Sequence, residues 1–367
     1  MPFRPPPRRA PLAPALVLAL TASALAGPAW GEAPAYPDHA DLLVVRDAAG
    51  GERPVEGAAD WEARRGHILE HLQEVMGPLP GPERVAPLDV KVISETREEG
   101  YIRRKVEYQT EPGDRVPAWL LIPDGPADAR RPAMLCLHQT IAIGKDEPAG
   151  LGGNKDLHYA KELALRGYVA LAPDYPNFGE YKRDPYAMGY ASASMKGIWN
   201  HKRAVDLLAS LPEVDPERIG VIGHSLGGHN AIFVSLFEPR IKAVVSSCGF
   251  NAFPYYYEGN IEGWSHRGYM PRLKAVYNLD LKKVPFDFPE LIGALAPRPF
   301  FTNSPLHDEN FEAEGVRVCI RAARPIYALL RAEGELIAEY PEAEHAFIPE
   351  VREKAYGFLD ARLKAGR

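Results

Sequence analysis

The feature that most constrains the fold is an alternation of short apolar strands and helical segments that begins near residue 131. Strands that are apolar along their whole length need cover on both faces, and a helix between two strands returns the chain so that the strands run parallel. The sequence therefore predicts an α/β fold with a mostly parallel sheet and helices on both faces. The expected strands are residues 132–138, 168–175, 218–223, 241–248, 298–304 and 335–341, and the expected helices are residues 155–167, 194–211, 226–237 and 350–364.

The segment before this alternation predicts an N-terminal extension, residues 27–114, that holds a helix and the first antiparallel strands. Residues 61–76 carry a helical pattern, which Gly77-Pro78 ends. Turn residues separate the extended segments that follow, which favours antiparallel pairing. These segments are residues 88–96, 101–109 and 115–123. Residues 115–367 are then expected to form one α/β domain, with an aromatic-rich insertion at about 250–285.

The first 26 residues have the composition of an export signal. A basic start, MPFRPPPRRA, precedes the apolar stretch PLAPALVLALTASALA, which ends in small residues suited to cleavage. We therefore expect a signal peptide at residues 1–26, with cleavage near Ala26 or Gly31, and a periplasmic or secreted protein without stable membrane association. The pair Arg8-Arg9 leaves twin-arginine export open as an alternative to the general secretory route.

A serine follows the third expected strand in the sequence Gly223-His224-Ser225-Leu226-Gly227, which has the pattern G-x-S-x-G. A strand that enters a helix through this pattern holds the serine on a tight turn with a positive φ, and the glycines leave room for that turn. The turn exposes the hydroxyl above the sheet edge and aims the N–H of Leu226 at the place where an oxyanion forms. Ser225 is therefore the expected nucleophile, although the pattern alone also fits a glycine-rich turn with an incidental serine.

Two further candidates follow later strands, at the same expected edge of the sheet. Asp308 lies after the fifth expected strand and His345 after the sixth, so the chain order is serine, acid, histidine. We expect Ser225 to attack a carbonyl, His345 to carry its proton and Asp308 to hold the imidazole tautomer. The alternatives are that Asp308 only caps its loop, with Glu309 or Glu344 as the acid, and that His345 is a surface residue.

The residues of these loops carry a resemblance to a known superfamily. Over about residues 115–365 the chain resembles α/β-hydrolases of the dienelactone hydrolase and acetyl xylan esterase-like branch, and it is also similar to the catalytic domain of prolyl oligopeptidase-type enzymes. The resemblance implies an α/β-hydrolase fold and ester hydrolysis. Dienelactone hydrolases use a cysteine where this chain has Ser225, and the Arg-Gly-Gln and Ser-Gln-Gly-Gly motifs of acetyl xylan esterases are absent. The likeness rests on LHQT, APDYPNFGEY, HKRAVDLLASLPEVDPERIGVIGHSLGG, ALAPRPFF and EHAF.

The loop after the first expected strand, His138-Gln139-Thr140, is expected to supply the second oxyanion donor. Related enzymes commonly have a glycine where Gln139 stands, and the backbone N–H of Thr140 is the expected donor beside that of Leu226. Gln139 is also a candidate substrate contact. The other candidate substrate contacts are aromatic: Tyr256 and Trp264 in the insertion and Phe178 after the second strand, with packing of the insertion as the alternative role.

Charge and cysteine content exclude several other classes of protein. The chain has 43 Lys+Arg against 49 Asp+Glu and no basic domain, so we expect no nucleic-acid partner. Cys136, Cys248 and Cys319 are too few for a disulfide scaffold, and at most one pair can close. Cys136 and Cys248 end or lie in apolar runs and are expected to be small buried strand residues. The segment His67–His71 matches the zinc pattern H-x-x-E-H, but the segment is too short for a protease domain and no third ligand is evident. A solvated helix face is therefore expected there, and no metal and no cofactor are expected.

These patterns together predict an exported serine carboxylic-ester hydrolase that works through an acyl-enzyme. The resemblance points to carbohydrate-linked acetyl or aryl esters, in a small molecule or a polysaccharide, as the substrates. The alternatives are a prolyl oligopeptidase-like peptidase or amidase and a non-catalytic binding protein with the hydrolase fold.

Overall fold

The computed structural model describes residues 33–126 and 130–364 of the 367-residue chain. The expected export signal, with its two cleavage positions, lies outside the described residues. From Ala33 onward the chain forms one compact unit. No helix in the described part of the chain is both long and apolar enough to cross a membrane.

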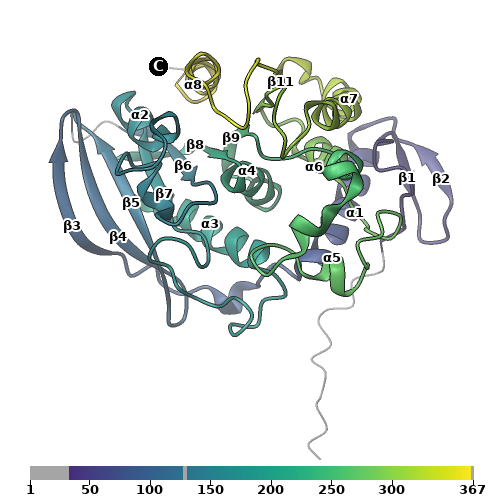
Figure 1. Cartoon of the computed structure of the whole chain (residues 1–367), viewed down its shortest axis with the longest axis horizontal. Helices are drawn as coiled ribbons and strands as arrows, with labels where there is room; N and C mark the ends of the chain where they lie inside the picture. The colour runs from purple at the N-terminus through teal and green to yellow at the C-terminus, as the bar shows by residue number, and fades with distance from the viewer. Residues whose placement is uncertain (1–32, 127–129, 365–367) are drawn as a thin grey trace, which may run out of the picture. The chain divides into compact units, whose positions relative to one another are not determined.

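A nine-stranded sheet forms the centre of this unit (Figure 1). Its strands, in chain order, are β3 (Lys91–Glu98), β4 (Tyr101–Glu111), β5 (Asp114–Pro123), β6 (Arg131–Leu137), β7 (Val169–Pro173), β8 (Val214–His224), β9 (Ile241–Ser247), β10 (Phe300–Asn303) and β11 (Leu336–Glu339). Their order across the sheet is β11-β10-β9-β8-β6-β7-β5-β4-β3. The strands from β6 onward pair in parallel, and β5, β4 and β3 add to one edge in antiparallel pairs. The predicted parallel sheet with an antiparallel N-terminal part is confirmed.

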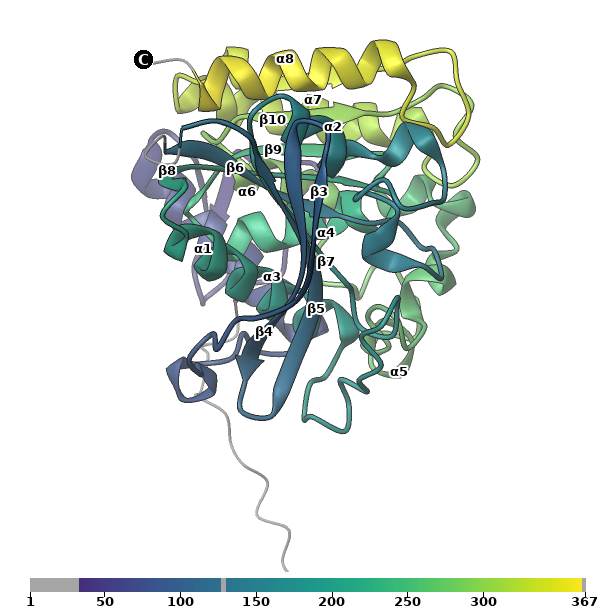
Figure 2. The same ribbon diagram turned by 90° about the vertical axis from the view of Figure 1, so that its left-hand side faces the viewer.

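Helices cover both faces of the sheet. They are α1 (Ala58–Met76), α2 (Tyr159–Leu165), α3 (Ala193–Ser210), α4 (Leu226–Phe237), α5 (Arg272–Ala275), α6 (Phe288–Leu295), α7 (Ala313–Leu329) and α8 (Pro349–Leu363). One core contains side chains of α1, α3, α4, α6 and α7, and a second core contains those of α2 and α8. Figure 2 shows α8 along one side of the sheet and the antiparallel edge strands facing the viewer.

Successive residues of the central strands supply the two cores in turn. In β6, Leu135 packs in the first core and Met134 in the second, and in β8, Val221 packs in the first and Ile222 in the second. This is the two-residue period of a strand, and both faces are apolar because both are covered. The continuous apolar runs seen in the sequence therefore reflect burial on both sides.

Some elements were not predicted from the sequence. A small hairpin of β1 (Val44–Arg46) and β2 (Glu52–Pro54) precedes α1. The side chains of β2 are exposed, so this strand carries no apolar signal. Helices α6 and α7 follow the insertion, and α7 contains Pro325, a residue that normally argues against a helix interior.

The H-x-x-E-H segment lies in α1, and its histidines bind the chain itself. Nδ1 of His67 is 2.8 Å from the Tyr36 hydroxyl, and Nε2 of His71 is 3.3 Å from the carbonyl oxygen of Ala33. His71 is buried, so the expectation of a solvated helix face is wrong for this residue. Both histidines attach the segment before β1 to α1.

All three cysteines are free and buried, and the burial of Cys136 and Cys248 was expected. Burial raises the pKa of each of these thiols well above its ordinary value. None of them is therefore a thiolate nucleophile at neutral pH.

Candidate active site

Ser225 lies between β8 and α4 on the tight turn that the sequence predicts. Its φ is 52° and its ψ is −115°, a strained conformation for a residue with a Cβ. The Ser225 N–H donates to the carbonyl of Ser247 at 2.8 Å. A Cβ on Gly223 would lie 2.2 Å from the carbonyl oxygen of Gly227, and a Cβ on Gly227 would lie 1.9 Å from that of Leu137. Steric exclusion is thus the physical reason for both glycines.

Asp308 and His345 meet above the carboxyl ends of β10 and β11. Nδ1 of His345 lies 2.8 Å from Oδ2 of Asp308. The other oxygen of Asp308 accepts the backbone N–H groups of Asn310, at 2.9 Å, and Phe311, at 3.0 Å. Burial by itself raises the pKa of Asp308, but the hydrogen bond and charge of His345 and the two N–H groups outweigh it, so the pKa falls below its ordinary value. An ionised Asp308 accepts the Nδ1 proton and leaves the lone pair of His345 on Nε2.

The alternative acids do not take this place. Glu309 and Glu344 are exposed, and neither forms a hydrogen bond with His345 in the described part of the chain. Nor is the Ser225 hydroxyl hydrogen-bonded to His345 within residues 130–364. Such contacts are often long before substrate binds and tighten in the reacting complex.

Buried polar groups pack beside the imidazole of His345. The ring centroid of His224 lies 4.9 Å from that of His345, and Nδ1 of His224 lies 2.9 Å from the Ser247 hydroxyl. The amide of Asn303 donates to this hydroxyl at 2.8 Å and to the carbonyl of Ala346 at 2.9 Å. Burial, together with the nearby His345, lowers the pKa of His224 to about 3, so His224 stays neutral. The cluster fixes the backbone next to His345 without adding a positive charge.

Hydrogen bonds also fix the loop that was predicted to supply an oxyanion donor. Nε2 of His138 accepts the Tyr175 N–H at 3.0 Å, and its Nδ1 lies 2.6 Å from the Gln139 carbonyl. Burial lowers the pKa of His138, which agrees with a neutral ring protonated on Nδ1. Leu226 opens α4, so its N–H belongs to the first helical turn, which lacks internal acceptors. Thr140 follows this loop and is exposed.

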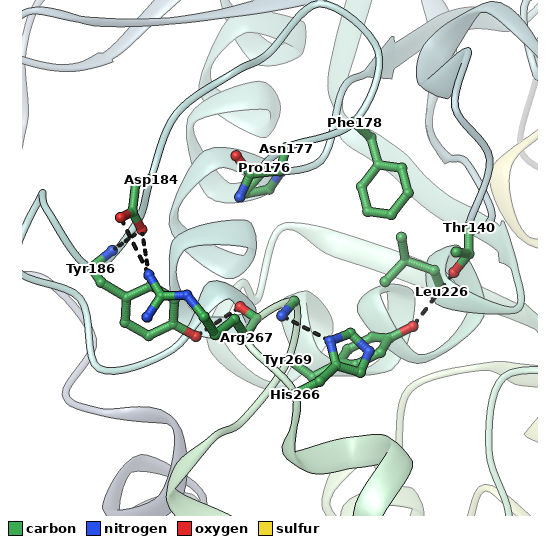
Figure 3. A pocket seen from close by; sticks show the side chains of 11 residues that line it. Thr140, Pro176, Asn177, Phe178, Asp184, Tyr186, Leu226, His266, Arg267 and Tyr269 are labelled. Atoms are coloured by element: carbon green, nitrogen blue, oxygen red, sulfur yellow. Dashed lines mark hydrogen bonds and ion pairs between the residues drawn. The ribbon is translucent and has the colours of Figure 1, made fainter.

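A pocket of about 450 Å³ opens beside Thr140 and Leu226 (Figure 3). At one end Phe178 and Tyr269 lie beside the two predicted oxyanion residues, and the Tyr269 hydroxyl lies 3.5 Å from that of Thr140. The other end is polar and charged. There Arg267 pairs with Asp184 at 3.3 Å, and the Tyr186 hydroxyl donates to the Arg267 carbonyl at 2.7 Å. The pocket therefore combines aromatic faces with hydrogen-bonding groups.

Of the four candidate substrate contacts, only Phe178 lines this pocket. The Gln139 side chain donates to the buried carboxylate of Glu147 at 3.0 Å. Tyr256 and Trp264 are buried in the insertion, where their ring centroids lie 5.8 Å apart.

The structure adds residues that sequence reasoning missed. His229, one turn after Ser225, is buried, and neither of its ring nitrogens has a hydrogen-bond partner among the described residues. Its ring centroid lies 4.8 Å from that of Trp264 and 5.2 Å from that of Tyr269. Burial lowers the pKa of His229 to about 3. A histidine four residues after the nucleophile was the available signal, but the sequence could not show that it lacks a partner.

Comparisons with known proteins agree with this fold. The family described as "Glucuronyl esterase, fungi" matches residues 184–331. A Bacillus subtilis protein, YtaP, described as a hydrolase, is 26% identical over 280 residues, which cover 72% of this chain and 88% of that protein. The 4-O-methyl-glucuronoyl methylesterase 1 of Wolfiporia cocos is 22% identical over 330 residues, 84% of this chain and 78% of that protein. A solved glucuronoyl esterase from Solibacter usitatus superposes with a TM-score of 0.71 at 18% identity, over 90% of this chain and 99% of that one.

The chain has the α/β-hydrolase fold, so the predicted fold is confirmed. The matched family and the descriptions of the relatives agree with the predicted carboxylic-ester hydrolase activity. In this hydrolase the sheet provides the elbow after β8, the acid loop after β10 and the histidine loop after β11 on one edge.

Proposed function

We propose that Ser225, Asp308 and His345 are the catalytic triad of this hydrolase and that Leu226 and Thr140 form its oxyanion hole. The observation that carries the proposal is the 2.8 Å bond between His345 and Asp308, at the same sheet edge as the strained Ser225 turn. Ser225 attacks the ester carbonyl while Nε2 of His345 takes its proton, and that proton then goes to the departing alcohol. Water, activated by the same nitrogen, hydrolyses the acyl-enzyme.

The substrate proposed is an ester of a sugar acid, in which the carbonyl belongs to a uronic acid. The family match and the names of the relatives support this class over a simple acetyl ester. The pocket supports it too, because an acetyl group is far smaller than about 450 Å³ and has no hydroxyls for the polar lining to bind. Aromatic faces beside polar groups suit the two kinds of surface on a pyranose ring.

Unpaired polar groups behind Tyr269 supply further support. Nε1 of Trp264 and both ring nitrogens of His229 are buried and have no hydrogen-bond partner among the described residues. Each such unsatisfied group costs about 1–3 kcal/mol of stability. A protein retains such groups more readily where a bound ligand completes their hydrogen bonds. Neither residue lines the pocket, so the hydroxyls of a bound sugar would complete these groups only where Tyr269, which lines the pocket and packs against both rings, moves aside.

The test compares three esters: a benzyl ester of glucuronic acid, acetylated xylan and p-nitrophenyl acetate. We expect the glucuronate ester to have the highest kcat/KM and Ser225→Ala to abolish its turnover. Ser210→Ala, which removes a serine hydroxyl at the end of α3, is the matched control and should keep full activity. Equal turnover by Ser225→Ala and wild type would refute the triad. Preference for acetylated xylan would refute only the substrate class.

A second activity and the export of the chain remain proposals. A prolyl oligopeptidase-like peptidase is the second candidate for the activity, and cleavage of Pro-containing peptides at a rate above that of any ester would favour it. Export to the periplasm or medium is tested by fractionation of cells that express the full chain, with N-terminal sequencing to locate cleavage near Ala26 or Gly31.

A further inference from the structure

A thiol lies beside the acid and base of the proposed triad. Cys248 directly follows β9, and its Sγ, one carboxylate oxygen of Asp308 and a ring nitrogen of His345 all lie within 4.8 Å of one another. These three residues form the only such cluster of potential metal ligands within residues 33–126 and 130–364. The triad chemistry proposed above makes no use of the cysteine.

We propose that Cys248, Asp308 and His345 form a binding site for a soft divalent cation, Zn²⁺ or Cd²⁺, and that its occupation inhibits the enzyme. One thiolate, one imidazole and one carboxylate are the donor types that Zn²⁺ takes in proteins, whereas Mg²⁺ and Ca²⁺ take oxygen ligands. Donor atoms around a tetrahedral Zn²⁺ lie roughly 3.3–3.8 Å apart, so the largest separation needs to close by about 1 Å.

The surroundings of Cys248 permit this movement. Its Sγ makes weak hydrogen bonds, 3.6 Å to the Ala346 carbonyl, 3.7 Å from the Asn303 amide and 3.8 Å from the Ser247 hydroxyl, and it also interacts with the Asp308 carboxylate. His345 is on a loop, and its side chain is 30% exposed, so a cation can reach the cluster from that side. Cys248 and Asp308 are buried, which limits the number of waters that compete for the ion.

Charge also favours a divalent ion. Binding breaks the S–H bond of Cys248 and releases its proton to solvent, and the thiolate and the Asp308 carboxylate then neutralise the two charges of the cation. His345 binds through Nδ1, so the ring gives its Nδ1 proton to solvent and takes one proton from solvent on Nε2, and it stays neutral. No electron transfer is involved. A fourth position, facing solvent, is left for water.

Inhibition follows from the same three bonds. His345 with its proton on Nε2 cannot accept the proton of Ser225, and Asp308 no longer orients the ring. The cation is thus an inhibitor of the acid–base pair and has no part in the ester chemistry.

The experiment uses Cd²⁺ for binding and Zn²⁺ for inhibition. Titration with Cd²⁺, followed by the ultraviolet absorption band of the cadmium–thiolate bond, should show one site in the wild type and none in Cys248→Ser. Cys136→Ser and Cys319→Ser, which remove the other buried thiols, should keep the band. This arm does not depend on the proposed esterase function.

The second arm rests on that function. Zn²⁺ should inhibit ester hydrolysis, and EDTA should restore it. Cys248→Ser should keep the basal activity and weaken the inhibition by more than about tenfold. Loss of even an outer-shell partner of a metal typically lowers metal affinity by at least about tenfold. His307→Ala, which removes an exposed histidine paired with Glu342, should leave the inhibition unchanged. The proposal would be overturned if the wild type lacked the cadmium band or if the band survived in Cys248→Ser. It would also be overturned if Zn²⁺ inhibited the wild type and Cys248→Ser equally, or if Mg²⁺ inhibited the wild type as strongly as Zn²⁺ does.

Discussion

Asp308→Asn separates the charge of the proposed acid from its shape. The amide oxygen can still accept the N–H groups of Asn310 and Phe311, which lie 2.9 and 3.0 Å from Oδ1 of the aspartate. That leaves the NH₂ group of the new side chain facing Nδ1 of His345, 2.8 Å from the present oxygen. Two donors cannot face each other, so Nδ1 must become the acceptor and the imidazole proton must move to Nε2.

The expected loss follows from this change of tautomer. His345 with its proton on Nε2 has no lone pair toward Ser225, and the imidazolium that forms in the reaction loses its anionic neighbour. In a serine protease with a Ser-His-Asp triad, the corresponding Asp-to-Asn change lowers kcat by about 10⁴. We expect a loss of about 10³–10⁴ here, which is about 4–5.5 kcal/mol of activation barrier. Stability should change by less than about 1 kcal/mol, because both loop hydrogen bonds persist.

The assay is steady-state hydrolysis of the best ester, with thermal unfolding measured on the same samples. Glu309→Gln is the matched control, since it removes an exposed carboxylate from the next position in the same loop and should keep wild-type kinetics. The reasoning is refuted if Asp308→Asn keeps kcat within tenfold of the wild type, or if Glu309→Gln or Glu344→Gln loses as much as Asp308→Asn does.

Three other substitutions test the loop of the proposed oxyanion donor Thr140, the attachment of the N-terminal segment through His39, and the proposed contact of Trp264 with a sugar. Gly227→Ala should lower kcat by about 10²-fold and the free energy of unfolding by about 1–3 kcal/mol. The new Cβ would lie 1.9 Å from the Leu137 carbonyl oxygen and would force the loop of Thr140 away from α4. Steady-state kinetics and calorimetry measure the two effects. His39 lies 2.8 Å from the buried Glu290, and although burial alone lowers its pKa, the bond and charge of Glu290 raise it overall above 6.5. Its stabilisation is therefore complete below pH 6.5 and is lost as pH rises through the higher folded value, so urea unfolding should show that His39→Ala costs about 1–3 kcal/mol at pH 6 and clearly less at pH 9. Trp264→Phe should lower kcat/KM for the glucuronate ester about fivefold, the worth of one hydrogen bond of about 1 kcal/mol, and leave p-nitrophenyl acetate hydrolysis unchanged; an equal loss on both esters would contradict a sugar contact.

The proposed serine, acid and histidine could be predicted from the sequence because their positions depend on local turn geometry or on the topology of the sheet. The turn of Ser225 needs only the strand before it, the helix after it and two glycines, all within one short segment. Asp308 and His345 are far apart in sequence, but a parallel sheet brings the ends of β10 and β11 to one edge, which the strand–helix alternation already implied. These features are determined by the sequence alone.

Other features depended on which side chains meet across the tertiary structure. No local pattern shows that Gln139 turns to Glu147, that His229 and Trp264 lack partners, or that Cys248 lies beside Asp308 and His345. Whether a polar group finds a hydrogen-bond partner, and how far apart potential metal ligands lie, depend on neighbours that are distant in sequence. Burial then decides how much each contact contributes in free energy. The sequence by itself therefore determined the fold and predicted the chain order of the proposed triad and the class of reaction. Only the packed structure decided the lining of the pocket, the unpaired donors near it and the thiol beside the proposed acid and base.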